Sequence, residues 1–107
     1  MDFNEVKNAV KAINFESLRK EEDGYFEAVI FKKDLEGLNT ILKSSLGEPA
    51  FPSNKKLSKE IENAIDEFGG IMRGQTLYYA IIASSTTIAM LWPWQDGQRI
   101  TLKLFLK

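Results

Sequence analysis

The fold is decided by residues 75–106, which read QTLYYAIIASSTTIAMLWPWQDGQRITLKLFL. Three stretches of this segment are rich in β-branched and aromatic residues and have the length of strands. They are Gln75–Ala83, Thr86–Trp92 and Arg99–Leu106. Ser84-Ser85 separates the first two, and a loop with Asp96-Gly97 separates the last two, as in short β-hairpins. We therefore predict a three-stranded antiparallel meander.

A fourth strand is expected at Tyr25–Lys32, which has the same aromatic and β-branched character. The charged run before it, Glu16–Asp23, is interpreted as an extension of the first helix. The turn signal Asp23-Gly24 ends that extension.

Three amphipathic helices account for most of the remaining chain, because apolar residues recur there at steps of three and four. Their apolar stripes are Phe3, Val6, Val10 and Ile13; Leu35, Leu38, Ile41 and Leu42; and Leu57, Ile61, Ala64, Ile65 and Phe68. Asp2, Asp34 and Ser58 are placed as N-caps, and Gly47 and Gly69-Gly70 as stops.

The predicted fold is an α+β two-layer sandwich, formed as one domain over residues 1–107 with the order α-β-α-α-β-β-β. A four-stranded antiparallel sheet lies under three helices. Several strands are apolar on both sides, so the second face of the sheet needs a cover. Its candidate interface residues are Tyr25, Val29, Phe31 and Phe105. Either one helix crosses to that face, a partner buries it, or its Tyr hydroxyls and small side chains tolerate solvent.

Composition excludes several kinds of chemistry. The chain has no histidine and no cysteine, so the usual catalytic dyads, triads and zinc sites cannot form, and we expect no metal and no cofactor. A net charge of −1 provides no field for a polyanion, so nucleic acid is not an expected partner. No apolar run reaches the length of a membrane span. The chain also lacks the cysteines that would point to an oxidising compartment. We therefore expect a cytoplasmic protein without a membrane partner.

Trp92-Pro93-Trp94 is the most unusual tripeptide of the chain. Proline cannot donate to a strand ladder, so the strand should end at Trp92 and Trp94 should project from the loop. Beside Arg99, paired indoles would form a binding platform. The alternative is that one or both indoles close the end of the core.

These observations favour a non-catalytic binding or regulatory module that acts through the apolar sheet face or the Trp-Pro-Trp loop. The expected partner is another protein or a second copy of the chain. The alternative is a small-molecule-binding protein or minor enzyme with a pocket at the sheet end. That pocket would be lined by Trp92, Trp94, Arg99, Arg73, and Tyr78 or Tyr79.

Overall fold

The computed structural model describes residues 2–52, 56–82 and 84–107, in which three α-helices accompany one five-stranded sheet. The helices are α1 (Phe3–Lys11), α2 (Leu35–Leu46) and α3 (Lys59–Ile65). The strands are β1 (Ser17–Glu22), β2 (Tyr25–Phe31), β3 (Thr76–Ile82), β4 (Ser85–Pro93) and β5 (Arg99–Leu106). Short 3-10 turns lie at Lys32–Asp34, before α2, and at Asp66–Phe68, after α3. The α+β class is confirmed. The predicted end of the first meander strand, Ala83, lies outside the described residues.

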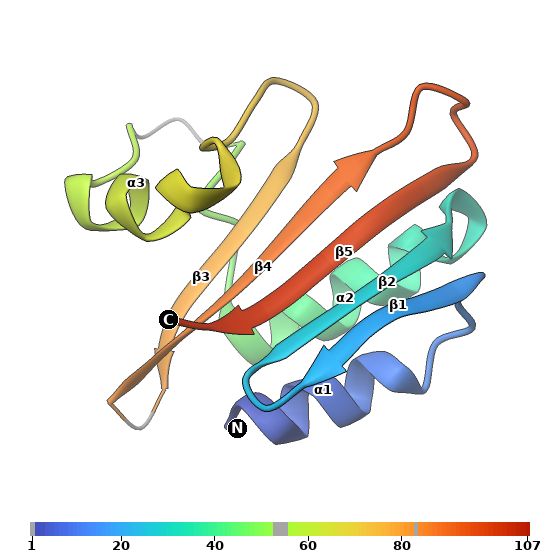
Figure 1. Ribbon diagram of the computed structural model, residues 1–107, viewed down its shortest axis with the longest axis horizontal. Helices are drawn as coiled ribbons and strands as arrows, with labels where there is room; N and C mark the ends of the chain where they lie inside the picture. The colour runs from blue at the N-terminus through green and yellow to red at the C-terminus, as the bar shows by residue number, and fades with distance from the viewer. Residues whose placement is uncertain (1, 53–55, 83) are drawn as a thin grey trace.

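The sheet has the strand order β1-β2-β5-β4-β3, with antiparallel neighbours throughout (Figure 1). The predicted meander of β3, β4 and β5 is confirmed, and β2 joins it beside β5. β4 continues one residue past Trp92, because Pro93 pairs with Ile100. β1 and β3 form the two edges of the sheet.

The charged run Glu16–Asp23 was wrongly predicted as helix, because it contains β1. α1 ends at Lys11, and the turn at Asp23-Gly24 folds β1 back onto β2. Gly24 has a φ of 74°, a conformation that glycine adopts without steric cost. The sheet therefore has five strands rather than four.

The helix ends follow the expected capping in two of three cases. Asp2 and Glu5 form a capping box at α1, and the Ser58 hydroxyl accepts the N–H of Ile61 at α3. Asp34 occupies the N-cap position of α2, but its side chain makes no capping bond. Gly47, with a φ of 86°, ends α2 as predicted.

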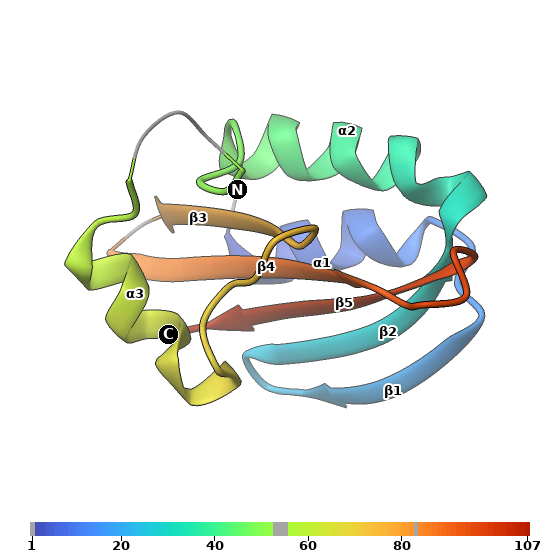
Figure 2. The same ribbon diagram turned by 90° about the horizontal axis from the view of Figure 1, so that it is seen from above.

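Helices α1 and α2 lie against one face of the sheet (Figure 2). Every second residue of β2, β4 and β5 points into this core, as the alternation of a strand requires. The buried residues here are Phe3, Val6, Val10, Phe26, Ala28, Ile30, Leu38, Leu42, Leu46, Tyr78, Ala89, Leu91, Ile100, Leu102 and Leu104.

The second face carries α3, so the prediction that all three helices share one face is wrong (Figure 2). Ala64 and Ile65 of α3 pack in one cluster with Leu77, Ile88 and Met90 of the sheet. A sheet that is apolar on both sides needs cover on both sides, and the crossing helix provides it over β3 and β4.

The last strand departs from simple alternation at its end. Phe105, a candidate interface residue of the second face, is buried within the chain, with its ring centroid 4.6 Å from that of Phe68. Leu106, the next residue, is 40% exposed. The 3-10 turn after α3 therefore completes the second core.

Candidate functional site

The structure brings Trp94 and Arg99 together at the β4–β5 hairpin. The indole Nε1 of Trp94 donates to Oγ1 of Thr101 at 2.8 Å, which holds the ring back over β5. The guanidinium carbon of Arg99 lies 5.8 Å from the centre of the Trp94 ring. Trp94 as a whole is 37% exposed, so it is not a core residue, and its hydrogen bond to Thr101 means that it is not a free loop side chain.

Arg99 is paired with Asp96 of its own hairpin and with Glu16, which precedes β1. Its Nη1 donates to Asp96 Oδ2 at 2.7 Å and its Nε donates to Glu16, and these two side-chain bonds raise the pKa of Arg99. Asp96 also accepts the backbone N–H groups of Gln98 and Arg99. The backbone bond from Gln98, followed by the bond from Arg99, lowers the pKa of Asp96. This arginine therefore orders the turn, and its charge is already matched by two carboxylates.

A cleft of about 190 Å³ lies between Trp94 and the start of α2. Its lining includes Lys32, Leu35 and Pro93 in addition to Trp94 and Arg99. Pockets that enclose a drug-sized molecule have volumes of roughly 300–1,000 Å³. The cleft is therefore of a size to take one side chain of a partner.

Trp92 lies on the second face of the sheet, where Lys103 Nζ is 4.7 Å from the centre of its ring. The Nε1 atom of Trp92 is buried and has no hydrogen-bond partner among the described residues. Trp92 and Trp94 therefore have different surroundings, and they do not form the paired platform expected from the tripeptide.

A polar cluster beside Trp92 was not predicted. The Tyr25 hydroxyl donates to Glu27 Oε1 at 2.6 Å, and Lys103 Nζ donates to the same oxygen at 3.1 Å. Burial by itself would raise the pKa of Glu27, but these two hydrogen bonds and the charges of Lys103 and Arg19 outweigh it and lower that pKa. Burial, then the bond to Glu27, raises the pKa of Tyr25. The pairing of Glu27 with Lys103 across β2 and β5 is the signal that would have revealed the cluster.

The other pocket candidates do not converge on Trp94. Tyr78 lies on the opposite face, buried, and its hydroxyl donates to Asn39 Oδ1 at 2.7 Å. Burial, and then the charge of Glu48, raises the pKa of Tyr78. Tyr79 faces the α3 side, and Arg73 is exposed in the loop before β3. The Trp, Tyr and Arg side chains of the expected pocket therefore lie in four separate places rather than around one cavity.

The candidate interface residues divide into two kinds. Val29 and Phe105 are buried within the chain. Tyr25 and Phe31 are partly exposed, and the charged ends of Lys33 and Arg99 lie 5.7 and 5.9 Å from the centre of the Phe31 ring. The second face is thus covered by α3 at one side and overlaid by charged side chains at the other.

The edge strand β3 was not singled out from the sequence. Leu77 donates its N–H to Phe51 at 2.9 Å and accepts the N–H of Ala50 at 2.8 Å, so these groups point away from β4. Because outward groups alternate along an antiparallel strand, those of Tyr79 and Ile81 point the same way. The outward N–H and C=O groups of Tyr79 and Ile81 have no backbone hydrogen-bond partner among the described residues (2–52, 56–82 and 84–107).

The side chains of β3 are uncharged, and Ile81 is 67% exposed. The end of β3 and the start of β4 lie at the lower left of Figure 1, below α3 in that view. An apolar edge strand whose outward backbone groups have no partner among the described residues is a template for pairing with another strand.

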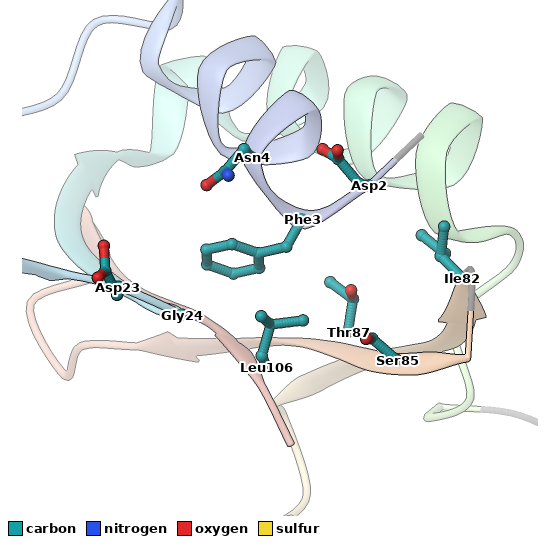
Figure 3. Close-up of a pocket in the computed structure, with 9 residues that line it drawn as sticks. All are labelled: Asp2, Phe3, Asn4, Asp23, Gly24, Ile82, Ser85, Thr87 and Leu106. Atoms are coloured by element: carbon teal, nitrogen blue, oxygen red, sulfur yellow. The ribbon is translucent and has the colours of Figure 1, made fainter.

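A hollow of about 290 Å³ lies where α1 meets the ends of β4 and β5 (Figure 3). The ring of Phe3 crosses it, and the Asp2 carboxylate beside it is engaged as the cap of α1. Thr87 is fully buried in its lining, and its hydroxyl has no hydrogen-bond partner among the described residues. A buried hydroxyl without a partner costs stability.

No family model matches the chain, and neither the curated proteins nor the solved structures contain a match to it. Within the described residues, no helix combines the length and apolarity needed to cross a membrane. The same residues contain no group of three or more carboxylate, imidazole or thiol side chains arranged to hold a metal ion.

Proposed function

We propose that this chain is a non-catalytic protein-interaction module that accepts an extended strand along β3. One observation carries the proposal: β3 is an uncharged edge strand whose Tyr79 and Ile81 backbone groups point outward without a partner among the described residues. Recognition by strand addition draws its affinity from such main-chain groups.

The side chains of β3 support this use of the edge. Tyr79 and Ile81 lie on one side of the strand, and Ala80 and Ile82 lie on the other. An added strand would cover Ile81, and removal of apolar surface from water contributes about 25 cal/mol per Å². The edge therefore offers both polar pairing and apolar contact.

The length of the free edge defines the ligand. Ala50 and Phe51 already occupy the outward groups of Leu77, and β3 ends at Ile82. The outward backbone groups that remain without a partner among the described residues are those of Tyr79 and Ile81. The matching ligand is a short, uncharged, extended segment.

A labelled peptide tests this proposal directly. The probe is a blocked hexapeptide of alternating Val and Thr with a Lys-Lys tail, titrated by fluorescence anisotropy into protein dilute enough to sediment as a monomer. We expect saturable binding that a peptide N-methylated at every residue does not show. Ile81→Pro should weaken binding at least tenfold, because it removes an outward N–H at a position where an edge strand tolerates proline.

A thermal melt checks that Ile81→Pro is folded, and Ile81→Lys provides a second variant with an intact backbone. The proposal is overturned if the wild-type chain binds neither peptide. It is also overturned if both variants bind as tightly as the wild type, because the contact would then lie elsewhere.

The Trp94 cleft is a second candidate contact for a protein partner. It is favoured by the hydrogen bond from Trp94 to Thr101, since a partly exposed indole held in one orientation loses little entropy on binding. A peptide library selected on the wild-type chain and counter-screened on Trp94→Ala tests it. Loss of the selected peptides from Trp94→Ala and retention by Ile81→Lys would assign them to the cleft, and the reverse would remove the cleft as a site.

A further inference from the structure

We propose, on the basis of the strand addition proposed above, that the strand received by β3 is β3 of a second copy of the chain. The two strands pair antiparallel about a two-fold axis at Ala80. Tyr79 of one copy then lies opposite Ile81 of the other, and the two five-stranded sheets become continuous.

The outward backbone groups select this register. An antiparallel pair with its axis at Ala80 joins the N–H and C=O of Tyr79 to those of the partner's Ile81, and the reverse pair forms by symmetry. An axis at Tyr79 would need the outward groups of Leu77, which Ala50 and Phe51 already use. An axis at Ile81 would pair Tyr79 with a residue past Ile82, where β3 ends.

The end of the free edge favours a second copy over a long peptide. In this register the partner's Ile82 lies opposite Tyr78, and the partner chain leaves the strand there because its own β3 ends. The next position along the edge is Leu77, which Phe51 covers. A longer extended peptide would meet Phe51, whereas a second copy turns away before reaching it.

The side chains are compatible with self-pairing. β3 contains no charged residue, so no like charges are placed opposite each other. The exposed Ile81 lies beside the partner's Tyr79, and an aliphatic side chain facing an aromatic ring is a favourable cross-strand pair. Because the contact is short, we expect dissociation at about micromolar concentration or above rather than nanomolar.

The chain contains no cysteine, so a single introduced cysteine is the sole thiol and reports the register. With the axis at Ala80, the two Ala80 Cα atoms are about 4.5 Å apart, as in a non-hydrogen-bonded pair. This spacing fits a disulfide. The two Ile82 Cα atoms are about 14 Å apart, because four residues of strand separate their levels at about 3.4 Å each. Ala80→Cys therefore tests the register, and Ile82→Cys is its matched control.

The experiment compares disulfide formation of Ala80→Cys and Ile82→Cys under mild oxidation, with rates corrected for the reactivity of each thiol toward a small reagent. We expect the Ala80→Cys dimer to form at least tenfold faster, and Ile81→Pro added to it should abolish that advantage. In the unmodified chain, amide exchange of Tyr79 and Ile81 should slow as protein concentration rises.

Equal or faster cross-linking of Ile82→Cys overturns the register. Sedimentation of the wild-type chain as a monomer at high concentration, with unchanged amide exchange, overturns self-pairing. If the monomer still binds the Val-Thr peptide, either result leaves the proposed strand addition on β3 standing. If the chain does not bind the peptide, both strand addition and self-pairing are overturned.

Discussion

The two edge strands of the sheet, β1 and β3, differ in how far they are protected against pairing with another chain. β1 reads SLRKEE, its six residues are exposed, and its pairing with β2 is irregular between Leu18 and Lys20. β3 reads TLYYAII and has no charged residue. Charges and irregular pairing keep a strand edge from pairing with another chain, whereas an uncharged regular edge invites it. β1 therefore has the charges and irregular pairing that protect an edge strand, and β3 lacks the charges and pairs regularly.

The charges of β1 also attach this edge to the rest of the molecule. Glu21 meets Lys7 and Lys11 of α1, and hydrogen bonds from Lys11 and then Lys7 lower the pKa of Glu21. Arg19 lies 3.9 Å from Glu27 on the other face. β3 is attached instead by apolar burial under α2 and α3. The two edges thus differ in what stabilises them.

The largest expected effect compares the same substitution at the two edges. Leu77→Ala should lower the free energy of unfolding by about 2–5 kcal/mol, because Leu77 is fully buried beneath α3. Leu18→Ala should change it by no more than about 0.5 kcal/mol, because Leu18 is 48% exposed. Chemical denaturation measures both. Similar values for the two variants would contradict the distinction between a packed and a solvated edge.

The second prediction concerns acid stability on the β1–β2 side. The folded-state pKa of Glu27 lies below its ordinary value of 4.5, so its contribution is complete above about pH 5 and is lost as the pH falls through the folded-state pKa. Glu27→Gln should cost roughly 1.5 kcal/mol at neutral pH and flatten the decline of stability below pH 5.

Glu22→Gln is the control for that prediction, because the Glu22 side chain is 62% exposed. It should leave both stability and its pH dependence nearly unchanged. Unfolding free energies measured from pH 7 to pH 3 would contradict the role of Glu27 if the two variants followed the same curve.

The third prediction places a charge on each edge in turn. Ile81→Lys should weaken self-association at least tenfold, a factor equal to about 1.4 kcal/mol. It places like charges close together across the proposed contact and removes apolar surface. Leu18→Lys should leave self-association unchanged. Sedimentation equilibrium over a range of concentrations measures both, and an effect of Leu18→Lys equal to that of Ile81→Lys would break the comparison.

The smallest effect tests two threonines that lie in neighbouring strands. Thr87→Val should raise stability by about 1 kcal/mol, because it replaces a buried hydroxyl that has no partner among the described residues. Thr101→Val should lower stability by about 1 kcal/mol, because the Thr101 hydroxyl accepts the indole N–H of Trp94. Thermal denaturation measures whether each substitution raises or lowers stability. A loss of stability in Thr87→Val would mean that solvent in the hollow of Figure 3 satisfies this hydroxyl.

Local pattern predicted most of the secondary structure and little of the site. The α1 capping box, the Ser58 cap, the stop at Gly47 and the strands β2 to β5 follow from residues close in sequence. Trp94 and Arg99 were predicted together because a hairpin joins them. The contact of Arg99 with Glu16, 83 residues earlier in the chain, depends on the segment that enters β1, which was predicted as helix.

By itself, the sequence determined the amphipathic helices, the two-sided apolarity of the sheet and the absence of imidazole and thiol chemistry, because periodicity and composition are properties of short segments. The tertiary structure decided which strands lie at the edges, and it placed α3 on the second face. Strand order depends on contacts between distant segments, and no local pattern specifies them. In the middle of a sheet, TLYYAII would be a buried strand, and its position at the edge is what leaves Ile81 67% exposed.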